Sequence, residues 1–149
     1  MKVSLQDWLN EGRLKTHKTS QKEIEQLFAV FERDMADAQA EALSADRRFT
    51  TAYNAALMVA RAALAASGYR TSGEGNHYWT IQSLAFTLKP DAETIKKFNK
   101  FRQKRNISDY EMIGIVSEHE VNETLALAQE LRGMVTEWLK KNHPELIGK

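Results

Sequence analysis

The chain has 149 residues, 42% of them hydrophobic, which is enough to form one packed domain without disulfides or metals. It contains no cysteine, so disulfides, thiolate metal sites and a cysteine nucleophile are excluded. Its 21 basic and 20 acidic residues give a net charge of +1, so any nucleic-acid surface must be a local patch.

A short helix is expected at about Leu5 to Asn10, before the first long helix. The long helix is predicted to begin after Ser20, because Ser20 and Glu23 have the spacing of a capping box, in which each side chain satisfies a backbone N–H. The apolar residues that follow recur at helical spacing: Ile24, Leu27, Phe28, Phe31, Met35, Ala38 and Ala42.

The second long helix is predicted between a cap at Ser44 and a stop at Gly68. One stripe of this helix is apolar and rich in alanine: Phe49, Ala52, Tyr53, Ala56, Leu57, Ala60, Ala63 and Leu64. Small side chains allow neighbouring helices to approach closely, so we expect this helix at the centre of the fold.

Residues 71–76 have the composition of a loop, and a helix is expected from about His77 to Leu88. Pro90 then opens a helix that we expect to continue to about Asn106. A second capping box, Ser117 with Glu120, precedes a last helix that ends at about Lys141.

No segment shows the alternation of a strand. The prediction is an all-α fold, an antiparallel bundle of four long helices plus short helices, in one domain over residues 1–149 with its core at about 20–141.

The helix after Pro90 breaks the usual segregation of apolar and charged residues. Ile95, Phe98 and Phe101 form its apolar stripe, and the same face continues into Arg102 and Arg105. Four lysines gather on the opposite face, which we interpret as solvated: Lys96, Lys97, Lys100 and Lys104.

A buried unpaired charge costs several kcal/mol, so the two arginines need partners. Three explanations stay open. The arginines line a polar groove at a subunit interface, or they tie the helix end to carboxylates such as Asp109, or the helix ends near Asn106 and leaves Asp109 at the surface.

The segment Arg105-Asn106-Ile107-Ser108-Asp109-Tyr110 resembles the signature of HEPN domains, which have an arginine, a polar residue and then a histidine five residues after the arginine. The residues Ala52 to Leu64, around Arg61, resemble the central helix of that family. The segments Gly73 to Trp79 and Val116 to Glu118 follow in the family's order, so the resemblance covers about residues 20–140.

The resemblance implies a helical bundle that dimerises and brings the signature arginines together in the dimer groove. Many HEPN proteins are metal-independent ribonucleases, and several are toxins encoded beside a nucleotidyltransferase-like antitoxin. Their arginine orients phosphate and their histidine serves in acid–base chemistry.

Carried onto this chain, Arg105 and Asn106 match the motif, and Tyr110 stands where the histidine belongs. Tyrosine is a poor base at neutral pH, so binding is favoured over cleavage. We expect a homodimer paired along the helix from Phe98 to Asp109. Its groove would bind RNA or a nucleotide phosphate without a metal or cofactor. Arg105 and Tyr110 are the candidates for any catalysis. The predicted groove residues are Arg102, Arg105, Asn106, Asp109 and Tyr110.

Other interpretations remain. In one, the protein is a non-catalytic module that binds a partner protein, for example a nucleotidyltransferase, and its arginines are structural. His77 begins a helix and either reaches the arginine groove, replacing the missing histidine, or caps and packs against the loop. The acidic residues Glu32, Asp34 and Asp37 suit a solvated helix face better than a metal site. Because no signal-peptide core or membrane-length apolar run occurs, we expect a soluble cytoplasmic protein.

Overall fold

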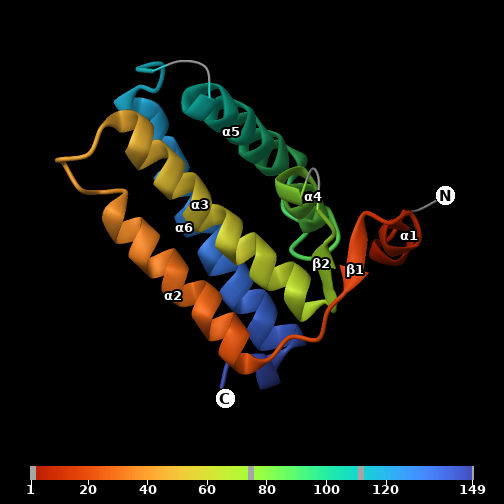
Figure 1. Cartoon of the computed structure of the whole chain (residues 1–149). Coiled ribbons are helices and arrows are strands. Elements are labelled where there is room, and N and C mark those ends of the chain that lie inside the picture. Colours follow the sequence, from red (N-terminus) through yellow and green to blue (C-terminus); the bar gives the residue numbers. More distant parts are fainter. Residues whose placement is uncertain (1–2, 74–75, 111–112, 149) are drawn as a thin grey trace.

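The computed structural model describes residues 3–73, 76–110 and 113–148, with only the backbone for residues 108–110. The fold over these residues is predominantly helical, as predicted (Figure 1). Its helices are α1 (Leu5–Asn10), α2 (Gln21–Asp37), α3 (Ala45–Ala66), α4 (Asn76–Gln82), α5 (Ala92–Tyr110) and α6 (Glu118–Asn142), with 3-10 turns at Ser83–Ala85 and Pro144–Leu146. Within the described part of the chain, no helix has both the length and the apolar character needed to cross a membrane.

A small sheet corrects the prediction that no strand is present. Strands β1 (Leu14–Thr16) and β2 (Tyr69–Thr71) pair antiparallel, with Lys15 opposite Arg70. Each strand has three residues, too few for an alternating pattern to stand out in the sequence. The pairing joins the segment before α2 to the segment after α3, and it places the former beside the start of the 71–76 loop.

Helix α3 lies at the centre, as its alanine-rich stripe predicted. It packs against both α2 and α6, and α5 lies on the side of α3 away from α2 (Figure 1). Every residue of the predicted α3 stripe is buried, with exposed fractions of 3% or less. Of the predicted α2 stripe, Ala42 is exposed and lies beyond the helix end at Asp37.

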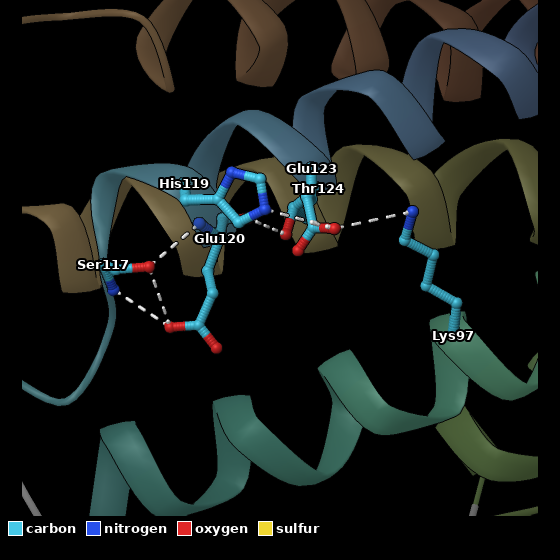
Figure 2. Close-up of polar contacts among 6 residues, drawn as sticks. All are labelled: Lys97, Ser117, His119, Glu120, Glu123 and Thr124. Atoms are coloured by element: carbon cyan, nitrogen blue, oxygen red, sulfur yellow. Dashed lines mark hydrogen bonds and ion pairs between the residues drawn. The ribbon is translucent and has the colours of Figure 1, made fainter.

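At three of the predicted helix boundaries, the expected capping residue adopts the expected contact or conformation. The Ser44 side chain accepts a hydrogen bond from the Arg47 N–H, and Gly68 adopts a φ of 98° just past the end of α3. Ser117 and Glu120 form both bonds of the predicted capping box at the start of α6 (Figure 2).

The capping box predicted for α2 is only half formed. Ser20 accepts from the N–H of Glu23, as expected. The Glu23 carboxylate turns away from Ser20 and accepts hydrogen bonds from Thr19 and His17 instead. Glu23 thereby joins a polar cluster that the local sequence pattern did not indicate.

Helix α5 packs through two aromatic pairs. Phe98 meets Tyr53 and Phe101 meets Phe49, each edge to face with ring centroids 5.8 Å apart. Both phenylalanines are buried in the protein's own core. They are therefore not available to the predicted pairing surface, which is left with the outer residues of α5.

Two predicted helix ends are wrong. Helix α5 continues to Tyr110 and does not stop near Asn106, which removes the explanation that an early helix end releases Asp109. Helix α4 ends at Gln82, and the chain then tightens into the 3-10 turn before Leu88.

Candidate functional site

The two arginines on the apolar face of α5 are half-buried and lie against α4. Together with the loop before α4 they line an open groove of about 370 Å³, which we call the arginine groove. Its described lining residues are Gly73, Asn76, His77, Tyr78, Arg102, Arg105 and Asn106.

Neutral groups hold the Arg102 side chain at this groove. Arg102 Nε donates to Asn99 Oδ1 at 2.8 Å, and its guanidinium carbon lies 5.4 Å from the centre of the Tyr78 ring. Among the described residues, no carboxylate pairs with Arg102. Its positive charge is therefore not neutralised by a described acid.

Arg105 is the residue that matches the signature arginine. Its Nη1 donates to Asn106 Oδ1 at 3.4 Å, and its guanidinium carbon lies 6.0 Å from the centre of the Tyr53 ring. Aromatic faces stabilise guanidinium groups without competing for their N–H donors. Both signature residues thus have their polar ends at the groove.

His77 also lines the arginine groove, which is the position that the first of the two interpretations weighed for it expects. Its Nδ1 lies 3.1 Å from the hydroxyl of Tyr53, which is fully buried. Burial raises the pKa of the Tyr53 phenol well above its usual range, so the hydroxyl keeps its proton. No other hydrogen bond of this hydroxyl occurs among the described residues, and we assign it as the donor to Nδ1.

This assignment fixes the tautomer of His77. With Nδ1 accepting, the ring proton of the neutral imidazole lies on Nε2, which becomes a donor. Burial, and then the charges of Arg105, Arg61 and Arg102, lower the pKa of His77 below its usual range. At neutral pH the side chain is uncharged and offers an N–H.

The structure brings together three of the five predicted site residues. Arg102, Arg105 and Asn106 line one groove, whereas the side chains of Asp109 and Tyr110 lie outside the described residues. Sequence reasoning missed Asn76 and Tyr78 as groove residues. Their only signal was the position beside His77 at the start of a helix, which does not reveal that α4 packs on α5.

The lysines of α5 do not extend the groove. Lys96, Lys97 and Lys100 are exposed, in agreement with the solvated face that we predicted. Lys97 lies 3.9 Å from a carboxylate oxygen of Glu123, and Lys104 lies 3.1 Å from one of Glu120. Figure 2 shows Glu123 between Lys97 and His119, so acids at the start of α6 offset part of this positive charge.

A second, more enclosed pocket of about 240 Å³ adjoins the groove and shares Asn76 and His77 with it. We call it the inner pocket. Its remaining walls come from α2, α3, α4, β2 and the segment before α2. His17 Nε2 lies 2.8 and 3.0 Å from the two Glu23 carboxylate oxygens in this pocket. Although burial alone raises the pKa of Glu23, hydrogen bonds from Thr19 and His17 lower it overall.

Two of the three acidic residues weighed as a metal site, Glu32 and Asp34, pair with arginines. Glu32 pairs with Arg132 at 3.1 Å, and Asp34 pairs with Arg33 at 3.1 Å. In the described part of the chain, no three histidine or acidic side chains come together in a way that would hold a metal ion.

No protein-family model matches the chain, and no curated protein is detectably similar to it.

Proposed function

We propose that the arginine groove binds the phosphate group of RNA or of a nucleotide. One observation carries the proposal: two guanidinium groups from α5 and the imidazole and amide of His77 and Asn76 from α4 line one groove. The described lining of the groove contains no carboxylate. Guanidinium, imidazole and amide donors favour an anion with several acceptor oxygens.

The contacts of Arg102 fit this role. Its partners, Asn99 and Tyr78, are neutral, so a phosphate would not have to displace an acid in order to pair with the guanidinium. The planar fork of arginine meets two phosphate oxygens at once. His77, uncharged and with its proton on Nε2, would add a further donor.

The same tautomer argues for binding rather than rapid cleavage. A general base must accept a proton, and the free nitrogen of His77 already carries one because Tyr53 occupies the other. Tyr110, which replaces the motif histidine, is a poor base at neutral pH. We therefore propose a phosphate-binding protein that has no efficient ribonuclease activity.

We further propose that two copies pair along α5, as the resemblance to HEPN domains implies. Two large apolar side chains at and beyond the end of α5 support the pairing: Ile107 is 38% exposed and Ile113 is 95% exposed. Exposed apolar residues of this size favour burial against a partner when they lie close together. From the same resemblance, we propose that the protein acts in a toxin–antitoxin or defence pair.

The second candidate is a non-catalytic module that binds a protein such as a nucleotidyltransferase. The contacts of Arg102 with Asn99 and Tyr78 favour it, because they give the arginine a structural role without any ligand. The two candidates differ in what an arginine substitution does. If the groove binds RNA, the substitution lowers the protein's affinity for RNA while the protein stays folded. If the protein is an interaction module, the wild type does not bind RNA and the substitution changes nothing in that assay.

The test measures RNA cleavage and RNA binding in parallel. Purified protein is incubated with total RNA with and without EDTA, and affinity for a labelled single-stranded oligoribonucleotide is followed across salt concentrations. We expect salt-sensitive binding without cleavage, weakened in Arg105→Gln and unchanged in Lys100→Gln, which removes an exposed charge from the same helix. Absence of binding by a folded protein would refute the proposal. Metal-independent cleavage that Arg105→Gln abolishes would instead refute the non-catalytic part.

Light scattering coupled to gel filtration tests the pairing. A mass of twice the 17.0 kDa chain is expected for the wild type, and a shift toward the single chain for Ile113→Asp. A wild type that stays at the single-chain mass at high concentration would exclude the pairing.

A further inference from the structure

The inner pocket and the arginine groove are neighbours on one helix face. Tyr53, Leu57 and Arg61 occupy successive positions four residues apart on α3, so their side chains lie in one row. Tyr53 contacts the groove residues His77 and Arg105, whereas Leu57 and Arg61 line the inner pocket. A ligand lying along this row past His77 would reach both.

The two cavities differ in chemistry. Four aliphatic residues line the inner pocket, Leu27, Leu57, Leu64 and Ala65, whereas the described lining of the arginine groove has none. The inner pocket also contains the charged side chains of Glu23, Arg61 and Arg70, so it offers both hydrogen-bond acceptors and donors. Aliphatic side chains beside fixed hydrogen-bonding groups are typical of a site for a flat ring with polar edges.

The size of the pocket also limits its ligand. Pockets that enclose drug-sized molecules measure about 300–1,000 Å³. The inner pocket, at about 240 Å³, is smaller than that range and suits a fragment of a ligand. The adjoining arginine groove, at about 370 Å³, has room for the remainder.

We propose that the inner pocket binds the base of a nucleotide whose phosphate lies in the arginine groove. The inference rests on the proposed function and narrows it, because it makes a nucleotide unit rather than phosphate alone the ligand. The ribose would pass Asn76 and His77, the two residues that both cavities share. Arg61 lies near this junction, since its charge lowers the pKa of both Glu23 and His77.

Glu23 gives the base site a preference. A carboxylate has about four acceptor positions, and Thr19 and His17 contact Oε1 while only His17 contacts Oε2. One position on Oε2 therefore remains for an N–H of the ligand. Adenine, guanine and cytosine can offer an exocyclic amino N–H, whereas the N3–H of uracil lies between two carbonyl oxygens that a carboxylate repels, so the first three are expected to bind more tightly.

The experiment compares ligands that contain one or both parts of a nucleotide. Affinities of the full chain for adenosine 5′-monophosphate, ribose 5-phosphate and adenosine are measured by calorimetry. We expect the nucleotide to bind about tenfold or more tighter than ribose 5-phosphate, because buried bases contribute that much in other sites. Leu27→Trp, which fills the inner pocket from its half-buried position, should remove this difference and leave ribose 5-phosphate affinity unchanged. Leu125→Trp, at a half-buried leucine of α6 outside the pocket, is the matched control.

Each outcome decides between the two proposals. Equal wild-type affinities for the nucleotide and ribose 5-phosphate would overturn the base site and leave the phosphate site standing. Binding of adenosine without binding of ribose 5-phosphate would overturn the phosphate site, and with it the nucleotide as the ligand, and leave only a site for the base. If none of the three ligands binds, both proposals fail.

Two further measurements cover the case in which the variant does not fold and identify the source of the nucleotide. If Leu27→Trp does not fold, amide chemical shifts of the wild type titrated with adenosine replace it; shifts at Leu27 and Thr80 are expected, and their absence overturns the base site. A short oligoadenylate distinguishes a free nucleotide from a residue of RNA, because the tighter of the two ligands identifies the source. Leu27→Trp must weaken that tighter ligand, and failure to do so overturns the proposal.

Discussion

Replacing Arg102 with glutamine removes one positive charge from the arginine groove and keeps a side chain of similar length. A charge-assisted hydrogen bond contributes about 1.5–3 kcal/mol. If Arg102 contacts one phosphate, the affinity for single-stranded RNA should fall by about 10- to 150-fold at low salt. Because Arg102 has no described carboxylate partner, the substitution leaves no acid unpaired among the described residues.

The salt dependence provides a second readout. Each phosphate contact on single-stranded nucleic acid contributes about 0.7 to the slope of log affinity against log salt. The slope for Arg102→Gln should be shallower than that of the wild type by about this amount. Lys100→Gln, which removes a charge from the exposed face of the same helix, should change neither the slope nor the low-salt affinity appreciably.

Fluorescence anisotropy of a labelled oligoribonucleotide measures both quantities. The folded state needs a control, because Arg102 also contacts Asn99 and Tyr78. Loss of the hydrogen bond to Asn99 and of one cation–π contact should cost about 1–2 kcal/mol, visible as a lower melting temperature. The reasoning is refuted if folded Arg102→Gln and Lys100→Gln lose the same small amount of affinity, since any surface charge would then serve equally.

Three further predictions concern Tyr53, His77 and the cap of α6. Tyr53→Phe should lower the free energy of unfolding by about 1 kcal/mol and raise the pKa of His77 measured by NMR, because the donor that favours neutral His77 is lost; an unchanged pKa would contradict the assigned tautomer. Since the pKa of His77 is lowered by folding, the unfolded chain takes up its proton first, so this residue should reduce wild-type stability as pH falls below about 6.5. In urea unfolding, the free energy of unfolding of His77→Gln should fall less over that pH window than that of the wild type. His119→Gln, at a mostly exposed site, should lose as much as the wild type. Equal losses in all three proteins would be inconsistent with a buried neutral His77. Ser117→Ala should cost about 1 kcal/mol in urea unfolding, because α6 loses its capping box, and a cost near zero would show that the cap is redundant.

The sequence was sufficient to predict the helices whose ends carry their own signals. The side chains of Ser44 and Ser117 accept hydrogen bonds from backbone N–H groups three residues on, and Gly68 adopts the positive φ that ends α3. The start or end of each helix is therefore encoded within a few residues. The alanine-rich stripe of α3 likewise identified the central helix, because side-chain size limits how closely helices approach. The same local reasoning singled out Arg102 and Arg105 as polar residues on an apolar face.

Other features depended on contacts that no local sequence pattern indicates. The β1–β2 pairing joins residues 14–16 to residues 69–71, and neither strand has a pattern of its own. Glu23 has the spacing of a capping residue, yet its carboxylate binds His17 and Thr19, which the chain brings within reach as it turns into α2. For Glu23, two interactions compete for one carboxylate, and the path of the chain before α2 decides which forms.

The candidate site illustrates the same division. The sequence determined that α5 carries two arginines on its inner face, because helical periodicity fixes which residues share a face. Only the tertiary structure placed His77 and Asn76 opposite them and connected the groove to the inner pocket. The protonation of His77 also depends on that structure, because it follows from the buried Tyr53 hydroxyl and from the charges of arginines on two helices. Periodicity acts within one helix, whereas the packing of α3, α4 and α5 assembles the site.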